Sequence, residues 1–413
     1  MEKNIVLQEI VDFYLQSNDF NGLPIYQMNN YSKEELLNLI DNDLVEAISE
    51  KEVLNPHIRG FNLNISKNVQ KNNATDIKSH TCFYPTEKAL EGVKIDYETP
   101  YTSLMQKGKK QFDIIFFDIE ILERYINNPK FLIIDNGYRG SICIRDEYYD
   151  DEDNNSEYIK DYGMAYIEGA ELKRAVAVFL IDLANLSPKI QMLWKAFELR
   201  NQKTCNVDSG FKKNLIYGEW VTDYWIFHAI IDEMIIINKQ CKAMDIPPLF
   251  SHTYSTNSYE MPEGYRNILL PTMKNYYDFV LVLEKMFVHN ISIKAFKKDG
   301  VLIKGIERKD NDGHDKGSLV MLEEWMNKNI KTNIEIKEVI IKPLKNIRKI
   351  RQVPAHEITN NKYDIGVYKK QNDLIIETYK AIRGIRLLFS NLPQANTIEI
   401  PEQLITGNNI VCY

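Results

Sequence analysis

The chain has few cysteines, no long apolar run and no excess of positive charge, and each absence excludes a class of protein. Its five cysteines are odd in number and scattered, without the paired short spacing of a zinc site or a redox pair. A reducing compartment is the simplest interpretation, so we expect a cytoplasmic protein. The strongest apolar runs, 112–122 and 225–238, are too short to span a membrane and contain acidic residues. Together with the lack of a signal pattern, this predicts no contact with a membrane.

The sequence also lacks a phosphate-cradling glycine loop and a Gly-x-Ser-x-Gly elbow, so neither chemistry is indicated. The formal charge of −7 argues against a protein that coats nucleic acid with its whole surface. The charge is uneven, however, because residues 337–386 contain 12 Lys and Arg against 5 Asp and Glu, a local charge of +7. Any binding to a phosphate backbone is therefore expected from this segment. An ordinary solvated face of basic side chains would explain the charge equally well.

A length of 413 residues predicts two domains. Helix and strand patterns alternate in the first part of the chain, which predicts a mixed α/β domain over residues 1–245. The individual predictions there are helices at 5–15, 32–49, 188–197 and 219–240, a loop at 62–78, a hairpin of strands 130–135 and 141–145, and a buried strand at 175–181. Residues 246–265 are rich in Pro, Ser, Thr and Asn, so we predict a linker there.

The last part of the chain has the periodicity of helices almost throughout. We predict an all-α bundle over residues 266–395, followed by a tail at 396–413, which gives an α+β fold class overall. The predicted helices are 272–291, 318–327, 343–352 and 365–389. In the third, Leu344 and Ile347 are expected to face inward, and Pro354 then marks a break or a fresh start. Asp364 is the expected cap of the last helix.

Arg351 and His356, with four residues between them, are the most informative pair in this helical segment. Arginine offers a permanent planar cation that matches a phosphate, and histidine exchanges a proton near neutral pH. These are the groups that RNA cleavage without a metal requires. Arg348, Lys349 and Gln352 are predicted to contact the RNA. The alternative is that Arg351 binds an acidic residue while His356 caps a helix or satisfies a buried polar group.

The Arg-x4-His spacing within a helical bundle resembles the signature of the HEPN superfamily, as found in prokaryotic toxin and defence ribonucleases. The resemblance covers about 271–393, and the order of the helices fits it. It implies a metal-independent and cofactor-free endoribonuclease in which Arg and His of two subunits meet across a homodimer interface. Arg351 would hold the scissile phosphate, and His356 would move the proton of the ribose 2′-hydroxyl or of the leaving oxygen. Two departures are Gln352, where Asn, Asp or His is common, and Pro354 inside the motif.

The resemblance also implies RNA as the partner and a role in phage defence or a toxin system. In such a layout the N-terminal domain, residues 1–245, would act as a sensor or regulator that binds an unidentified trigger. Two other interpretations stay open. The bundle would be a catalytically inactive HEPN-type module for dimerisation or RNA binding, or residues 1–245 would contain an unrelated, metal-dependent enzyme that uses Asp113, Asp118 or Glu120. We favour strand-edge positions for these three acids.

The remaining histidines and acidic clusters are predicted to be structural. His228 lies within an apolar helix pattern and is expected to pack in a core. His80, His252 and His289 have no partners at the spacing of metal ligands. The acids at 310, 312 and 315 lack the order of an EF-hand, so an acidic turn is favoured over a cation loop.

Overall fold

The chain folds into two compact units that are described separately below. The computed structural model describes residues 4–412 except 18–19, 30, 60–62, 77–79, 150–155, 170–172, 216, 257–259, 301–302, 332 and 357–359, and no side chain at 355–356. The first unit comprises Met1–Ile133, Ser141–Gly169 and Arg174–Val207, and the second comprises Ile134–Gly140, Ala170–Lys173 and Asp208–Tyr413. Both helices and antiparallel sheets are present, which confirms the predicted α+β class.

A small antiparallel sheet begins the first unit, with strand order β1-β3-β2. Its strands and helices are α1 (Ile5–Gln16), β1 (Leu23–Pro24), η1 (Ile25–Gln27), α2 (Lys33–Asp41), β2 (Val45–Ser49), α3 (Lys67–Thr75) and β3 (Thr81–Pro85). The central strand is buried along its whole length and Phe83 pairs with both neighbours, Leu23 and Ala47. Burial on both faces explains why this strand has no alternation of polar and apolar residues.

Two predictions in this region are wrong. The helix predicted at 32–49 ends at Asp41, because Asp43 takes a positive φ of 53° and the apolar residues that follow pair with β3 as strand β2. The Ser32 cap is confirmed, since its hydroxyl accepts from the backbone N–H of Glu35 at 3.1 Å. Helix α3 occupies most of the predicted 62–78 loop, where Ser66 caps its N-terminus.

A larger sheet follows, with strand order β4-β8-β7-β6-β5 and with β9 paired to β7. The elements of this region are α4 (Pro100–Gln106), β4 (Ile114–Asp118), η2 (Ile119–Leu122), α5 (Glu123–Ile126), β5 (Phe131–Asp135), β6 (Arg139–Ile144), η3 (Asp146–Tyr148), β7 (Asp161–Ile167), β8 (Arg174–Phe179), α6 (Leu180–Ala184), α7 (Pro188–Ala196), η5 (Gln202–Thr204) and β9 (Cys205–Val207). The predicted hairpin is β5–β6 and the predicted buried strand is β8, so both are confirmed. Gly137 turns the hairpin with a φ of 86°, which a residue with a side chain rarely adopts.

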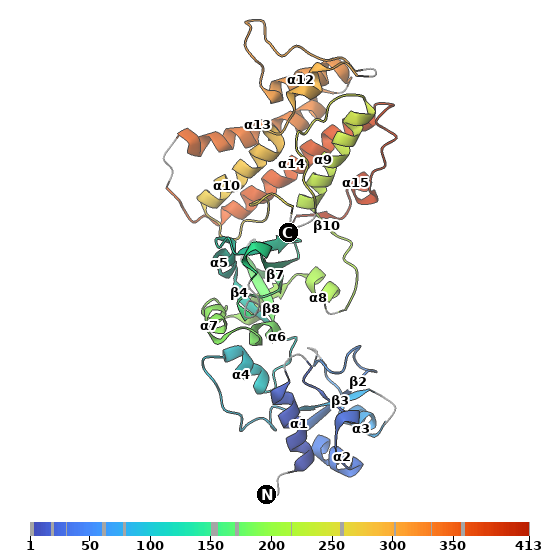
Figure 1. Ribbon diagram of the computed structural model, residues 1–413, viewed down its shortest axis with the longest axis vertical. Coiled ribbons are helices and arrows are strands. Elements are labelled where there is room, and N and C mark those ends of the chain that lie inside the picture. The colour runs from blue at the N-terminus through green and yellow to red at the C-terminus, as the bar shows by residue number, and fades with distance from the viewer. Residues whose placement is uncertain are drawn as a thin grey trace. The chain divides into compact units, whose positions relative to one another are not determined.

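From Asp208 onward, the described residues of the second unit are mainly helical and include a short pair of parallel strands, β10 and β11. Its elements are α8 (Ser209–Leu215), β10 (Tyr224–Trp225), α9 (Ile226–Ala243), α10 (Met273–Leu283), η6 (Glu284–Val288), α11 (Ile293–Lys297), α12 (Ser318–Asn329), α13 (Ile334–His356), α14 (Gly366–Ser390), α15 (Glu402–Thr406) and β11 (Ile410–Val411). Helix α14 packs against both α9 and α13, and α13 packs against α10 (Figure 1). Close approach of α13 and α14 depends on Gly384, where a Cβ would lie 2.8 Å from Ile340 Cγ1.

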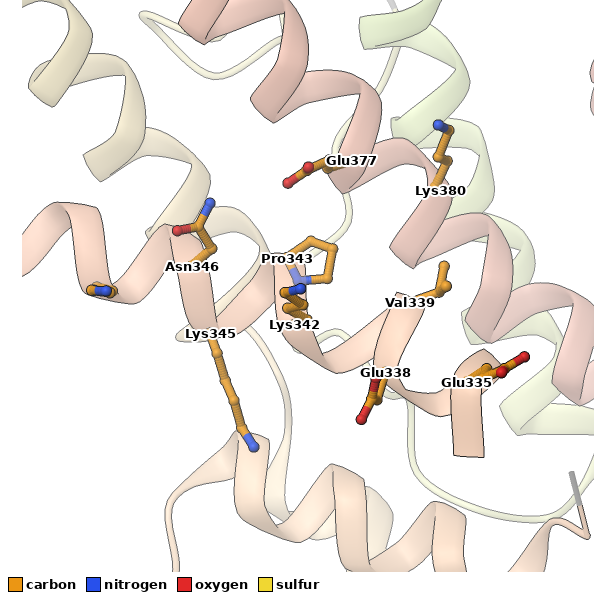
Figure 2. A pocket seen from close by; sticks show the side chains of 10 residues that line it. Glu335, Glu338, Val339, Lys342, Pro343, Lys345, Asn346, Glu377 and Lys380 are labelled. Carbon is orange, nitrogen blue, oxygen red and sulfur yellow. The ribbon is translucent and has the colours of Figure 1, made fainter. Parts of the chain in front are cut away.

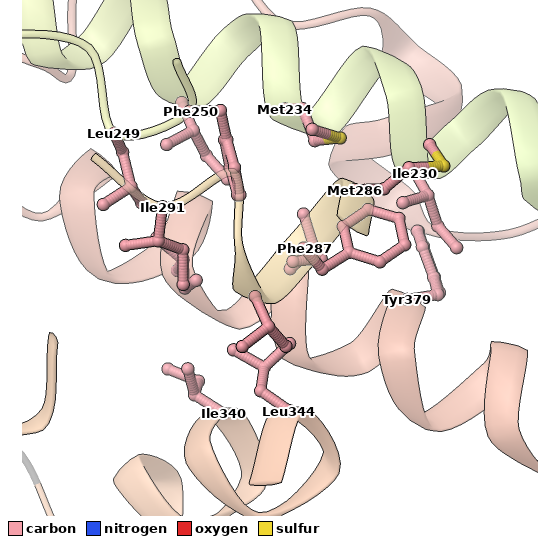
Figure 3. Packing of buried hydrophobic residues seen from close by; sticks show 14 of the residues in the cluster. Ile230, Met234, Leu249, Phe250, Met286, Phe287, Ile291, Ile340, Leu344 and Tyr379 are labelled. Atoms are coloured by element: carbon pink, nitrogen blue, oxygen red, sulfur yellow. The ribbon is translucent and has the colours of Figure 1, made fainter. Parts of the chain in front are cut away.

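One apolar core joins these helices. Figure 3 shows Ile230 and Met234 of α9, Met286 and Phe287 of η6, and Leu344 of α13 within the same buried cluster. Burial of side chains of this size stabilises a fold by roughly 1.5–3 kcal/mol each, so the turn η6 and the middle of α13 are fixed by the same packing. This matters for the site described below, because those two elements carry its charged groups.

The boundaries of the second unit differ from the predicted domain limits. The unit begins at Asp208 rather than after the 246–265 linker, because the apolar face of α9 packs against α14. Phe250 and Tyr265, inside the predicted linker, are buried in the core. The predicted tail is also part of the unit, since Leu404 is buried and β11 pairs with β10.

Helix α13 is longer than the predicted helix at 343–352. It begins at Ile334, and both Pro343 and Pro354 lie inside it, so Pro354 is not a break. The carbonyl of Val339 then has no intrahelical partner, a loss that water can offset because Val339 is exposed. Leu344 and Ile347 are fully buried, as predicted. Asp364 is not the N-cap that the sequence predicted, because α14 is capped at Ile365; its Oδ1 accepts instead from the N–H of Gly366 at 2.9 Å, in the turn just before the helix.

Candidate functional site around Arg351

Arg351 lies in the last two turns of α13 and faces a buried carboxylate. Its Nε is 3.0 Å from Oε2 of Glu284, the first residue of η6. The arginine side chain is 39% exposed, whereas that of Glu284 is only 3% exposed. The Nε–H bond of Arg351 is not aligned with this oxygen. Among the described residues, Oε2 of Glu284 therefore accepts no hydrogen bond. A buried carboxylate oxygen in this state is uncommon and calls for a functional or structural reason.

Glu284 also lies close to a histidine of its own chain segment. Its Oε1 is 3.6 Å from Nε2 of His289, whose side chain is 64% exposed. The turn η6 is π-helical, and the backbone N–H of His289 donates to the carbonyl of Glu284 at 3.0 Å. In an α-helix the neighbours on one face are three or four residues apart, and the wider π turn brings the residue five positions later over the first. The result is a row of Arg351, Glu284 and His289.

A groove of about 380 Å³ opens beside Arg351, between α10 and the end of α13. The residues that line it are Met273, Lys274, Tyr277, Asp278, Leu281, Arg351, Pro354, Asn360 and Asn361. Lys274 pairs with Asp278 at 2.9 Å, so these two charges compensate each other. Arg351 is the other cation that lines the groove. Its terminal guanidinium nitrogens have no hydrogen-bond or ion-pair partner among the described residues.

The predicted RNA-contacting residues lie on two different sides of α13. Arg348 is exposed, and its NH1 would be 3.9 Å from a Cβ placed at Gly317. Because residues three and four apart share a helix face, Arg348, Arg351 and Gln352 form one side. Lys349 is directed elsewhere, since it lines a second groove. His356 is the last residue of α13, and its side chain lies outside the described residues.

The second groove, of about 820 Å³, lies along α13 and α14 (Figure 2). Four lysines and three glutamates line it: Lys342, Lys345, Lys349, Lys380, Glu335, Glu338 and Glu377. Lys345 also pairs with Glu323 at 2.7 Å. Although this groove is the larger of the two, its nearly balanced charge gives it little preference for a phosphate, so it is a weaker candidate for an RNA site.

The alternative acidic site in the first unit is not supported by the geometry. Asp113 accepts the backbone N–H of Lys110 through its Oδ2 at 3.2 Å, and Asp118 accepts that of Glu120 through its Oδ1 at 3.0 Å. Both carboxylates therefore stabilise local turns at the ends of β4. Glu120 is exposed. This agrees with the strand-edge interpretation of the three acids.

Two other groups of polar side chains contain residue types found in metal or catalytic sites, but their exposure or protonation does not favour such a role. The ligand atoms of Asp310, Asp312 and His314 lie within 4.8 Å of one another, yet all three residues are exposed and Oδ1 of Asp310 is already bonded to two backbone N–H groups of the turn. Cys82 lies 3.5 Å from Nδ1 of His57, but burial raises the pKa of its thiol to about 12, which disfavours a nucleophilic thiolate.

Among the remaining histidines, His228 is half-buried against Trp225 and Tyr224, with ring centroids 5.1 and 6.1 Å away. Its predicted packing role is confirmed. Burial lowers the pKa of its imidazole to about 4. Its Nε2 has no hydrogen-bond partner within the described residues.

Sequence reasoning missed Glu284 and misjudged the surroundings of His289. Glu284 is 67 positions from Arg351 along the chain, so no local spacing could pair them. The one signal present was Glu284-x4-His289, which an α-helical periodicity places on different faces and only a π turn brings together.

Comparison with known proteins does not extend this description, because no family model, curated protein or solved structure matches the chain. Among the helices in the described residues, none is both long enough and apolar enough to cross a membrane.

Proposed function

We propose that the chain is a metal-independent endoribonuclease of the HEPN type, which cleaves RNA by attack of a ribose 2′-hydroxyl on the adjacent phosphate. The observation that carries the proposal is the setting of Arg351. Its side chain is partly exposed, lines a groove, and lies with Nε 3.0 Å from the buried carboxylate of Glu284. A planar cation held in this way suits bidentate binding of a phosphate.

In this proposal Arg351 binds the scissile phosphate and offsets the negative charge that grows on it as the 2′-oxygen attacks, which is the electrostatic contribution that usually dominates such catalysis. Arg348 and Gln352, on the same side of α13, contact the RNA backbone next to it, and Lys349 adds positive charge from the adjoining side. His356 moves a proton.

The proposal includes a homodimer formed through the helical unit. Positions five apart on an α-helix are separated by about 140° around its axis, so Arg351 and His356 start from different sides of α13. An arrangement in which two subunits bring these groups together satisfies the chemistry without bending the helix. A role in phage defence or as a toxin, with a trigger bound by the first unit, belongs to the same proposal.

A second candidate function is RNA binding without cleavage. It is favoured by the ion pair itself, because the charge of Arg351 is already compensated in part by Glu284. The two candidates make different predictions for one assay.

The test incubates the purified full chain with tRNA and total RNA in the presence of EDTA. We expect cleavage that leaves 2′,3′-cyclic phosphate and 5′-hydroxyl ends, while DNA of the same sequence stays intact because it lacks the attacking hydroxyl. Arg351→Ala and His356→Ala should each abolish cleavage while the protein stays folded, with at most a small decrease in melting temperature for Arg351→Ala. Arg308→Ala is the matched control, because this surface arginine also pairs with a carboxylate, Asp315, at 2.7 Å.

Cleavage that continues unchanged in Arg351→Ala and His356→Ala would refute the proposed active site. RNA binding that depends on Arg351, without any cleavage by the wild-type chain, would establish the binding module instead.

A further inference from the structure

Cleavage by a 2′-hydroxyl requires two proton transfers, and the proposed function assigns only one group to them. The attacking hydroxyl must lose a proton, and the 5′-oxygen that leaves must gain one. A single imidazole in one place cannot easily serve both, because the two oxygens lie on opposite sides of the phosphorus atom. The chain should therefore hold a second group near Arg351.

His289 has the position for this second group. It is separated from Arg351 only by the carboxylate of Glu284, whose two oxygens lie 3.6 Å from His289 Nε2 and 3.0 Å from Arg351 Nε. Its ring is exposed, so an RNA strand bound to Arg351 can reach it. The preceding backbone is held in place, because the hydroxyl of Ser318 donates to the carbonyl of Val288 at 3.1 Å.

The carboxylate also selects the form of the imidazole. A carboxylate next to one ring nitrogen favours the tautomer that carries the proton on that nitrogen. The separation of 3.6 Å is longer than a hydrogen bond, so the carboxylate acts here through its charge, which favours the proton on the nearer nitrogen, Nε2, and leaves the lone pair of Nδ1 to accept a proton. A buried acid that orients an exposed histidine in this way is the arrangement that general bases use in unrelated hydrolases.

We infer that His289 is the general base of the proposed ribonuclease and acts in the same subunit as Arg351, with Glu284 as the positioning residue for both. This inference rests on the proposed function. As the 2′-oxygen forms its bond to phosphorus, its proton passes to Nδ1 of His289. The bond from phosphorus to the 5′-oxygen breaks, and that oxygen takes a proton from His356. One histidine gains the proton that the other loses, so the reaction needs no further reactant than solvent to restore both.

The inference is tested by single-turnover cleavage of tRNA by full-length variants. His289→Ala should lower the rate by on the order of 10²–10⁴-fold, the usual contribution of a general base. Added imidazole should restore part of that rate, which a merely structural loss would not allow. Glu284→Gln, which keeps the shape of the buried side chain, should lower the rate while RNA binding is retained.

His314→Ala is the matched control. His314 is 81% exposed, lies in the same unit and has Asp310 at 3.8 Å, so it reproduces the features of His289 without the neighbouring arginine. Its loss should leave the rate unchanged. A wild-type rate in His289→Ala, or a loss that imidazole does not repair, would overturn this inference while Arg351→Ala still reports on the proposed function. If the wild-type chain cleaves no RNA, the proposed function fails and the inference fails with it.

Discussion

Two arginines, Arg351 on α13 and Arg386 on α14, each contact a buried glutamate, and they differ in how far the arginine side chain remains exposed. Arg386 is 2% exposed and binds Glu233 at both carboxylate oxygens, from Nε at 2.6 Å and from NH2 at 3.1 Å. Its NH2 also donates to the carbonyl of Leu404 at 2.8 Å, which holds α15 to α14. Arg351 makes one poorly aligned contact to Glu284 and stays partly exposed.

The difference separates an ion pair that is enclosed by the fold from one that leaves its arginine partly exposed beside a groove. Around Arg386 both Nε and NH2 donate inside the fold and the two side chains are 2% and 0% exposed, so a ligand has no access to the pair. Around Arg351 the carboxylate fixes one nitrogen and leaves the rest of the guanidinium available beside a groove. Local composition does not distinguish the two arginines, since both lie on basic amphipathic helices; the spacing to His356 marks Arg351 but does not show which carboxylate either arginine meets.

The largest expected effect is on stability at the first pair. Arg386→Met removes the partner of a fully buried carboxylate, so the free energy of unfolding of the helical unit should fall by roughly 3–5 kcal/mol. The double variant Glu233→Met with Arg386→Met should recover most of this loss, because no unpaired charge remains. Urea titration followed by tryptophan fluorescence measures both. Equal stabilities of the wild type and Arg386→Met would show that the pair does not stabilise the unit.

His228, a half-buried group whose Nε2 has no hydrogen-bond partner among the described residues, extends the comparison to pH. Burial lowers the pKa of His228 to about 4 from an ordinary value of 6.5, so between these pH values the unfolded chain binds a proton that the folded chain does not. Stability should be complete above pH 6.5 and should fall by up to about 3 kcal/mol as the pH is lowered to 4. The neighbouring Asp232, whose pKa burial raises, also titrates at acidic pH.

The contribution of His228 is therefore read as a difference between the wild type and His228→Phe. The variant should lose less stability on acidification than the wild type, measured from melting temperatures at pH 7 and pH 5. Parallel curves for the two proteins would mean that this histidine is not desolvated.

At the second pair the effect on stability should be much smaller. Arg351→Met leaves Glu284 without its arginine. Because the Arg351 side chain is 39% exposed and its contact is poorly aligned, solvent screening should limit the loss in free energy of unfolding to about 1 kcal/mol or less. The same urea titration measures it. A loss as large as that of Arg386→Met would place Arg351 among the structural arginines and weaken the proposed function.

The smallest effect concerns the basic surface of α13. Lys349→Ala should weaken RNA binding modestly and reduce the slope of log affinity against log salt by about 1, because one phosphate contact is lost. Lys298→Ala is the control, since this exposed lysine pairs with Asp245 away from α13. Equal slopes for the wild type and Lys349→Ala would exclude Lys349 from the RNA interface.

Much of the fold could be predicted because its signals are local. The cap at Ser32, the hairpin around Gly137 and the inward faces of Leu344 and Ile347 all follow from a few neighbouring residues. The domain limits could not be predicted in this way, because the burial of Phe250 and the pairing of β11 with β10 depend on segments distant in the sequence. Pro343 misled for a related reason, since the buried side chains of Ile340 and Leu344 on either side of it hold α13 in the core. Pro354 also lies inside the helix, but it is exposed and has no such packing around it among the described residues.

Some residues of the candidate site could likewise be predicted from the sequence, and others could not. Arg351 could be singled out from charge and spacing, because its chemistry is carried by its own side chain. Glu284 and His289 could not, because their role depends on a π turn and on a contact across 67 residues. The sequence therefore identified the cation but not the carboxylate that orients it.

The single-turnover rate of RNA cleavage by Arg351→Lys, compared with the wild type at equal folded fraction, tests the central claim most directly. Lysine keeps the positive charge but lacks both the planar fork and the Nε contact to Glu284, so we predict a rate lower by about 10²-fold or more. A rate equal to that of the wild type would contradict the claim that an oriented guanidinium at this position acts on the phosphate.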